Sequence, residues 1–448
     1  MSLRLIYGKS GCGKSEYCFK EIAKNVNKEK IYMIVPNQMA LMAEKRLMEK
    51  ADNLALVNTE VITFSRMAFR VRNEIGGAKK TNLSKSGKAM LLYDILSKCK
   101  DNLNFLGKNA ENVDIIGNSI TEFKKHRINI DNLKEEANTT TDIYLKLKLN
   151  DMITMYEEFE KSIQDKFLDE NDVLDILNTQ ILESNQFKDA IIYIDEFVGF
   201  TTQEYEIIAK LMQLAKEVNV TICTDNLVQQ EDADKDIFYA NKNTGIKLIN
   251  LAKEYGIEIE DDVKLTELHR FKNSELKHLE ENFYAVPYKT YKEEPKNIKL
   301  FLANNQYTEI EHIASEIVKL VRNENYRYKD ISVITKNLNL YSSLIKVIFA
   351  SYNIPVFIDE KKELSENVLV KFLIAVLEIC NKNWSYEAVF NYLKTGFVNI
   401  DKEEIFKLEN YCIRWGIKGN KWYKEDWNYV GKDEYTEEEL ARLNELRK

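Results

Sequence analysis

The sequence predicts an α/β protein with a parallel sheet that is split by a helical insertion and followed by a second α/β domain with a helical extension. Three observations predict it. Short apolar runs alternate with helical segments over residues 1–75, residues 80–185 show helical spacing without a clear strand, and the alternation returns after residue 298. Buried strands that alternate with helices form parallel sheets covered on both faces.

The individual elements follow from apolar runs and their breakers. In the first part we predict strands at 3–7, 31–35, 61–64, 190–194 and 218–223, with helices at 15–28, 39–50 and 65–72. In the second part we predict strands at 298–302, 331–335 and 355–358, with helices at 309–322, 341–351 and 368–380. The last helix begins with a capping-box pattern at Thr436 and Glu439 and reaches the final residue without a C-cap, so we expect a fragment of a longer protein.

Composition limits the class of protein. The chain has 448 residues, 44% hydrophobic and 30% charged, which indicates a soluble globular protein of several domains. Its net charge of −8 excludes a wholly basic nucleic-acid binder, so any DNA contact needs a local basic groove or a partner. Six scattered cysteines without a C-x-x-C pair indicate reduced thiols, and no signal peptide or membrane span is evident. We expect a cytoplasmic protein.

A phosphate-binding motif follows the first predicted strand. Residues 8–15 read Gly8, Lys9, Ser10, Gly11, Cys12, Gly13, Lys14 and Ser15, which fits G-x-x-x-x-G-K-[ST] between a strand and a helix. Glycines let backbone N–H groups converge on one anion, and the helix directs its positive end there. Lys14 would neutralise the β- and γ-phosphates of ATP, and Ser15 would offer its hydroxyl to a magnesium ion (Mg2+). We therefore predict a P-loop domain that binds ATP.

The second half of such a site is an acidic residue at the end of a buried strand. Asp195 and Glu196 follow the apolar run 190–194. Carboxyl ends of parallel strands are where open α/β sheets bind ligands. We expect Asp195 to hold magnesium and Glu196 to activate the attacking water as the catalytic base.

With both motifs in place, the chain resembles superfamily-1 helicases of the UvrD type and, more closely, the AddB family of helicase–nuclease subunits. Beyond the two motifs, the likeness rests on residues 35–38 (VPNQ), 63–66 (TFSR) with 69–70 (FR), 195–201 (DEFVGFT), 328–333 (YKDISV), 354–359 (IPVFID) and 391–396 (NYLKTG). The resemblance implies a P-loop NTPase domain at 1–79 and 186–284, the insertion at 80–185, a linker at 285–297, a second RecA-like domain at 298–380 and a helical subdomain at 381–448.

The resemblance also implies a function. It implies an AddA-type helicase–nuclease partner, processing of double-stranded DNA ends for recombinational repair, and recognition of a hotspot sequence in single-stranded DNA. The family's nuclease with a 4Fe-4S cluster belongs to a C-terminal part that this sequence does not contain. Arg270 would take the place of a phosphate-contacting arginine. Glutamines that read adenine and couple hydrolysis in active helicases have no counterpart here, so we expect ATP binding without translocation.

The DNA contacts are expected at Thr63, Phe64, Arg66 and Arg70, which combine aromatics for base stacking with cations for phosphates. An equally open interpretation places Phe64 in the core and the arginines on a solvated face. The basic cluster 124–127 could contact duplex DNA, although a solvated helix face is the more typical interpretation, and the lysines between residues 79 and 88 leave the same two interpretations open. Two other functions stay open, an active superfamily-1 DNA helicase and a P-loop small-molecule kinase.

Overall fold

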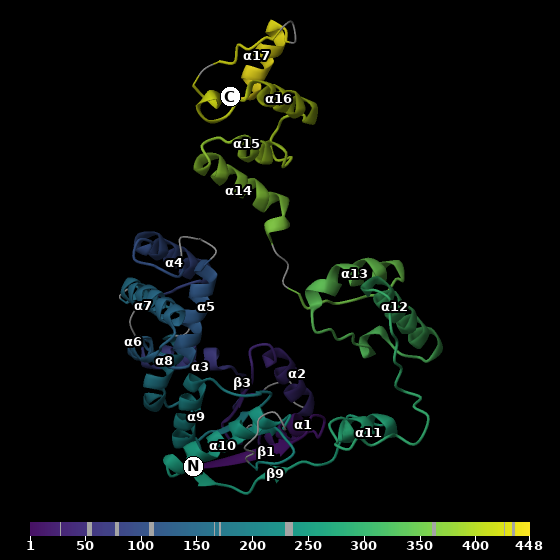
Figure 1. Cartoon of the computed structure of the whole chain (residues 1–448). Coiled ribbons are helices and arrows are strands. Elements are labelled where there is room, and N and C mark those ends of the chain that lie inside the picture. Colours follow the sequence, from purple (N-terminus) through teal and green to yellow (C-terminus); the bar gives the residue numbers. More distant parts are fainter. Residues whose placement is uncertain are drawn as a thin grey trace. The chain divides into compact units, whose positions relative to one another are not determined.

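The computed structural model describes residues 1–26, 28–51, 56–76, 80–106, 112–164, 166–169, 172–228, 236–360, 364–424, 426–431 and 435–448. The chain divides into two compact units, Met1–Lys299 and Leu300–Lys448. Figure 1 shows the strands gathered in the first unit, with helices making up most of both units. No helix in the described ranges is long and apolar enough to cross a membrane.

The first unit is built on a parallel sheet of seven strands in the order β3-β2-β6-β7-β1-β8, with β9 also paired to β1. The strands are β1 (Ser2–Gly8), β2 (Ile31–Ile34), β3 (Thr59–Ile62), β6 (Ile191–Ile194), β7 (Glu217–Cys223), β8 (Glu258–Ile259) and β9 (Val263–Lys264). Gly8 lies opposite Cys223, and Ile194 lies opposite Val220. The carboxyl ends of β1, β6 and β7 therefore meet at one edge of the sheet.

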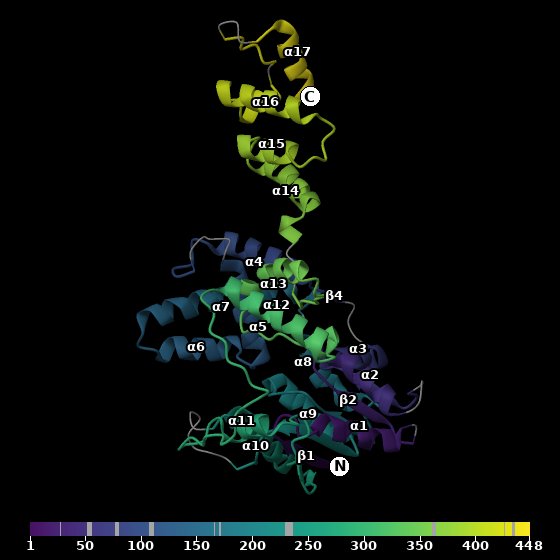
Figure 2. The same ribbon diagram turned by 90° about the vertical axis from the view of Figure 1, so that its right-hand side faces the viewer.

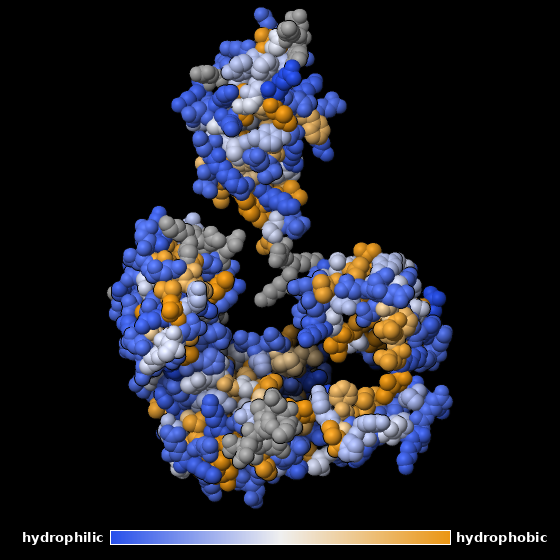
Figure 3. All heavy atoms as spheres, viewed as in Figure 1, coloured by the Kyte–Doolittle hydropathy of each residue, from blue (hydrophilic) through white to orange (hydrophobic). Residues whose placement is uncertain are grey.

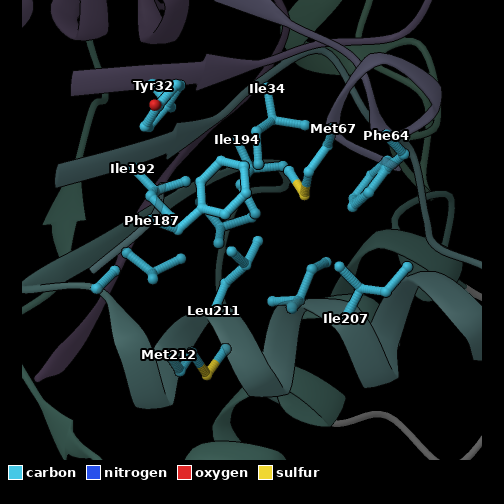
Figure 4. Close-up of a cluster of buried hydrophobic side chains, with 14 of the residues drawn as sticks. Tyr32, Ile34, Phe64, Met67, Phe187, Ile192, Ile194, Ile207, Leu211 and Met212 are labelled. Atoms are coloured by element: carbon cyan, nitrogen blue, oxygen red, sulfur yellow. The ribbon is translucent and has the colours of Figure 1, made fainter. Parts of the chain in front are cut away.

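Helices cover both faces of this sheet. One face packs against α1 (Lys14–Asn25) and α2 (Ala40–Lys50), and the other against α3 (Phe64–Ile75), α8 (Asp172–Gln180), α9 (Thr202–Leu214) and α10 (Tyr239–Glu254). In Figure 4, Ile207 and Leu211 of α9 face Ile192 and Ile194 on the strands. The predicted three-layer α/β arrangement is therefore confirmed for this unit, because its strands are apolar on both faces.

Two details of this sheet differ from prediction. Phe64 begins α3 instead of ending β3, because the Thr63 hydroxyl accepts a hydrogen bond from the Arg66 N–H at 3.3 Å and caps the helix. The strands β8 and β9 were not predicted, since each has only two residues and neither forms an apolar run.

The helical insertion has a hydrophobic core of its own. It contains α4 (Lys85–Cys99), α5 (Asn112–Lys125), α6 (Ile130–Thr139) and α7 (Ile143–Ile163), which cluster beside the sheet in Figure 2. Two short strands that the sequence did not indicate, β4 (Thr81–Asn82) and β5 (Phe167–Leu168), pair in parallel at its base. After them, α8 and the 3₁₀ turn η1 (Ile181–Glu183) already belong to the core of the sheet, so the insertion ends before residue 185. Its predicted start at 80 adjoins residues 77–79, which lie outside the described ranges.

The first unit ends with α11 (Ser274–Asn282) and the segment after it, which we predicted as a linker. Glu275 of α11 accepts hydrogen bonds through Oε1 from the backbone N–H groups of Lys296 and Asn297 at 3.2 and 2.8 Å. The far end of this segment is thereby held against α11. The first compact unit ends at Lys299, two residues after this hydrogen-bonded end.

The second unit has two small cores. The first lies between α12 (Gln306–Asn323) and α13 (Leu338–Ser351), close to the 3₁₀ turn η3 (Tyr328–Asp330). The turn η4 (Leu364–Glu366) and α14 (Val368–Asn381) follow. The second core joins the end of α14 to α15 (Tyr386–Leu393), α16 (Lys402–Trp415), η5 (Gly419–Trp422) and α17 (Glu437–Leu446). The capping box predicted for the last helix is present, because Thr436 and Glu439 each accept a hydrogen bond from the other's backbone N–H.

The three strands predicted in the second unit are not formed among its described residues. Residues 298–302, 331–335 and 355–358 carry no strand pairing. A strand forms only when a neighbouring strand lies about 4.8 Å away. Residues 331–335 and 355–358 instead line a groove of about 1140 Å³ and do not pair with each other. Ile331 and Ile358 pack against the core between α12 and α13, but other apolar side chains of these segments are open to solvent, with Leu300 100% exposed and Ile334 93% exposed. Figure 3 shows apolar atoms at the surface of the lobe that holds α12 and α13.

Candidate nucleotide-binding site

The glycine motif forms a tight loop between β1 and α1. A Cβ atom on Gly8 would lie 2.3 Å from the Leu265 carbonyl oxygen, so only glycine fits there. Gly13 has φ +82° and serves as the N-cap of α1, a conformation that L side chains rarely adopt. The loop leads directly into the first turn of α1, which is the end of a helix that favours an anion.

The Lys14 ammonium group lies inside the curve of this loop. Its Nζ donates hydrogen bonds to the carbonyl oxygens of Gly8 at 2.9 Å and Lys9 at 3.0 Å. These two carbonyl groups hold the ammonium inside the loop. Phosphate oxygens are anionic and therefore accept stronger hydrogen bonds from an ammonium than neutral carbonyls do.

Asp195 is the buried acidic residue of the site. It directly follows β6, is 2% exposed, and its Oδ1 accepts a hydrogen bond from the Thr221 hydroxyl of β7. Its Oδ2 is buried and has no hydrogen-bond partner among the described residues. An unpaired carboxylate oxygen in such a position is costly unless a cation or water satisfies it. The donor set of Asp195 and the nearby Ser15 hydroxyl therefore fits a magnesium ion, which prefers oxygen ligands.

Glu196 has an unusual backbone conformation. Its φ is +67°, which is uncommon for a residue other than glycine and is often found at functional sites. Its Oε1 accepts a hydrogen bond from the Ser15 hydroxyl at 3.0 Å, although the two residues are 181 positions apart. The end of β6 and the start of α1 are thus joined directly across the site.

One cavity of about 660 Å³ contains the predicted groups. Lys14, Ser15, Asp195, Glu196 and Arg270 all line it. Arg270 donates from Nη1 to the Ser10 hydroxyl at 3.0 Å, which places the guanidinium over the loop. Segments far apart in the sequence therefore meet at the carboxyl edge of the sheet.

Two residues of the predicted loop, Lys9 and Cys12, do not line the cavity with their side chains. Lys9 forms an ion pair with Glu280 of α11 at 3.3 Å, so only its backbone is available to a phosphate. Cys12 is buried, and burial raises the pKa of its thiol, which keeps it protonated.

Several cavity residues were not singled out from the sequence. Thr221 could have been found from strand register, because it lies one position beyond the Ile194–Val220 pair. His269 donates from its backbone N–H to the Gly11 carbonyl at 3.0 Å and packs beside Gly13. No sequence pattern indicates this contact, which depends on the chain returning to the loop after β9. Arg46 and Lys50 of α2 complete the basic side of the cavity.

The segment expected to contact DNA has a different set of exposed residues from the one predicted. Thr63 and Phe64 are 5% and 6% exposed, and the Phe64 ring packs edge-on against Phe197 with centroids 5.7 Å apart. Phe64 is therefore part of the core, and its expected role in base stacking is wrong for this conformation. Phe69, which is 66% exposed, is the accessible aromatic of α3.

The two arginines of the same segment differ. Arg66 is exposed, whereas Arg70 forms an ion pair with Glu60 at 2.5 Å. Arg66 and Phe69 are thus an exposed cation and an exposed aromatic ring on α3. Of the basic cluster 124–127, Lys124 is buried among carboxylates and Arg127 pairs with Asp175 and Glu206, so these two do not lie on a solvated face.

Comparisons with known proteins cover the whole chain. A family described as "ADDB, N-terminal" matches residues 5–280, and one described as "UvrD-like helicase C-terminal domain" matches residues 263–445. Proteins named as the B-type subunit of an ATP-dependent helicase/deoxyribonuclease are similar over 100% of this chain: one from Clostridium tetani (strain Massachusetts / E88) is 42% identical and one from Clostridium novyi (strain NT) is 40% identical. The chain spans 41% and 40% of the length of these two relatives.

Proposed function

Because this chain belongs to the AddB N-terminal family, we propose that it is the nucleotide-binding, DNA-contacting part of a subunit that processes DNA ends. Its relatives are named for helicase and deoxyribonuclease activities, and this chain corresponds to about 40% of their length. For the whole protein we propose a complex with an AddA-type helicase–nuclease partner, action on double-stranded ends in recombinational repair, and recognition of a hotspot sequence. A protein that acts on bacterial chromosomal DNA works in the cytoplasm.

The observation that carries the nucleotide-binding proposal is that one cavity contains a cation bound only to neutral carbonyls and a carboxylate oxygen without a hydrogen bond, as far as the structure describes the chain. The Lys14 ammonium has only carbonyl partners, and Asp195 Oδ2 has none in the described part of the chain. ATP with its magnesium ion supplies an anion to the first and a cation to the second. Magnesium, held by Ser15 and Asp195, would neutralise charge on the β- and γ-phosphates.

The other residues of the site would bind and orient the phosphates of ATP. The loop's backbone N–H groups and the first turn of α1 would hold the β-phosphate, and Lys14 and Arg270 would contact the terminal phosphate. Glu196 would exchange its hydrogen bond with Ser15 for one with a water beside the terminal phosphate, and would accept that water's proton if hydrolysis occurs. Nucleotide binding without hydrolysis would need all of these contacts but not the proton transfer to Glu196.

The proposed DNA contact on α3 predicts that substitutions there weaken DNA binding. Substituting Arg66→Ala together with Phe69→Ala should weaken binding of a single-stranded oligonucleotide by more than about tenfold, because a phosphate contact and a stacking surface are both removed. Fluorescence anisotropy with a labelled oligonucleotide measures this. Tyr255→Ala, which removes another exposed aromatic of the first unit, should bind like the unmodified chain. Unchanged affinity in the Arg66/Phe69 variant would remove α3 from the DNA interface.

A fully active helicase is the alternative. The sequence after Asp195 and Glu196 reads Phe197-Val198, without the glutamine that such helicases carry, and this favours binding over translocation. An unwinding assay on the chain without a partner separates the two: we expect no strand displacement, and ATP-dependent unwinding would establish the alternative. Membership of the AddB family leaves the small-molecule kinase without support.

A further inference from the structure

We propose that Thr221 is a positioning residue of the nucleotide site, whose hydroxyl holds the Asp195 carboxylate in the orientation that receives magnesium. The inference rests on the proposed function, since magnesium enters the site together with ATP. Thr221 is not assigned as a ligand of the metal. It acts on the metal through Asp195, whose side chain it restrains.

Thr221 lies between the two halves of the site. β7 is the strand that separates β6, which leads to Asp195, from β1, which leads to the phosphate-binding loop. Thr221 is paired with Ile6 of β1, and Asp195 lies beside it, one position beyond the last paired residues of β6 and β7. Thr221 is 4% exposed and lines the same cavity as Lys14 and Ser15. Its hydroxyl is therefore enclosed within the site, next to the carboxylate.

The contact with Asp195 restrains one rotation. The torsion that turns an aspartate carboxylate about its last carbon–carbon bond has only broad energy minima. The Thr221 hydroxyl donates to Oδ1 and so restrains this torsion, while Oδ2 stays without a hydrogen-bond partner in the described part of the chain. One oxygen is thus held and the other is left for a cation. Because the carboxylate is ordered before the ion arrives, binding does not have to supply the free energy of ordering it.

The strand itself does not require a hydroxyl at this position. The neighbours of Thr221 in β7, Val220 and Ile222, are buried and apolar, and valine, which has nearly the shape of threonine, is equally suited to a strand. A buried hydroxyl costs free energy unless it forms a hydrogen bond. Within the described residues, the hydroxyl of Thr221 forms its hydrogen bond with Asp195. The orientation of this carboxylate is therefore the property that the hydroxyl controls.

The test compares the affinity of the whole chain for ATP in magnesium and in EDTA, by isothermal titration calorimetry. For Thr221→Val we expect the gain in affinity from magnesium to be about tenfold smaller, as when the hydrogen-bond partner of a metal ligand is removed, with the affinity in EDTA unchanged. Thr221→Ser keeps the hydroxyl and should keep the gain to within about threefold. Thr59→Val is the matched control and should change neither affinity, because it removes a buried hydroxyl of β3 that has no hydrogen-bond partner among the described residues.

The outcomes separate this inference from the proposed function. If the gain from magnesium persists in Thr221→Val but is lost in Asp195→Asn, Thr221 does not position the carboxylate and the proposed function stands. If the unmodified chain gains no affinity from magnesium, both are wrong. If Thr221→Ser loses the gain as fully as Thr221→Val, the hydroxyl is not the acting group and the inference is overturned. Matching thermal unfolding curves show that the variants are folded, and Thr221→Ala, which removes the same hydroxyl, replaces a valine variant that does not fold.

Discussion

Replacing Lys14 with alanine is expected to lower the affinity for ATP with magnesium by about 100-fold or more. The Lys14 ammonium is the cation enclosed by the loop, and its present partners are two neutral carbonyl oxygens, at 2.9 and 3.0 Å. Charge-assisted hydrogen bonds to phosphate contribute about 1.5–3 kcal/mol each, so the loss of two of them is consistent with this factor. Isothermal titration calorimetry measures it directly.

The fold should survive this substitution. Lys14 begins α1, where its side chain contacts only the loop, and alanine is a good helix former. Lys20→Ala is a matched control, because Lys20 belongs to the same helix but is 64% exposed and forms a long ion pair with Glu16 at 3.8 Å. We expect the control to bind nucleotide normally. Equal affinities for the Lys14 variant and the control would contradict the assignment of the loop.

The substitution Lys124→Met is expected to destabilise the protein by about 2–3 kcal/mol, less than for a fully buried pair, because it removes the cation from Asp172 and Glu160, which are partly exposed, while the buried Asp169 keeps Lys88 at 2.9 Å. The Lys124 side chain is 5% exposed, and its Nζ lies 2.7 Å from both Asp172 and Glu160 and 3.6 Å from Asp169. Burial alone would lower the pKa of Lys124, but Asp172 and Glu160 raise it above its ordinary value, so the group stays charged. Urea unfolding followed by circular dichroism gives the free-energy change.

The neighbouring residue provides the control. Lys125 is 38% exposed and pairs with Glu122 at 3.0 Å on the surface of the same helix. Surface pairs of this kind contribute at most about 1 kcal/mol, so Lys125→Met should have little effect. If the Lys124 variant loses less than about 1 kcal/mol, the ion cluster does not stabilise the contact between the insertion and the β5–α8 segment.

The parts of the fold that the sequence predicts are those with a local signal. Five of the seven strands of the central sheet contain mostly apolar runs, of which residues 190–194 are the clearest, and the P-loop has a fixed spacing between strand and helix. Asp195 and Glu196 could be placed because the end of a buried parallel strand is a defined position. Their meeting with Ser15 follows from strand order, in which only β7 separates β1 from β6.

Other features depend on contacts that no local pattern contains. In the sequence, a basic cluster on a solvated face cannot be told from one that is buried. Only the fold shows that Lys124 lies among Asp169, Asp172 and Glu160. Phe64 was ambiguous because an aromatic next to a strand suits both a core and a stacking surface. The apolar runs of the second unit predict strands, yet pairing requires a neighbouring strand that its described residues do not provide.

The most direct measurement is the effect of magnesium on ATP affinity in the unmodified chain and in Asp195→Asn. If Asp195 and the P-loop form one site, magnesium should strengthen ATP binding at least about tenfold in the unmodified chain and should have little effect in the variant, because the amide cannot supply the charge that the cation requires. An Asp195→Asn variant that responds to magnesium as strongly as the unmodified chain would contradict the account.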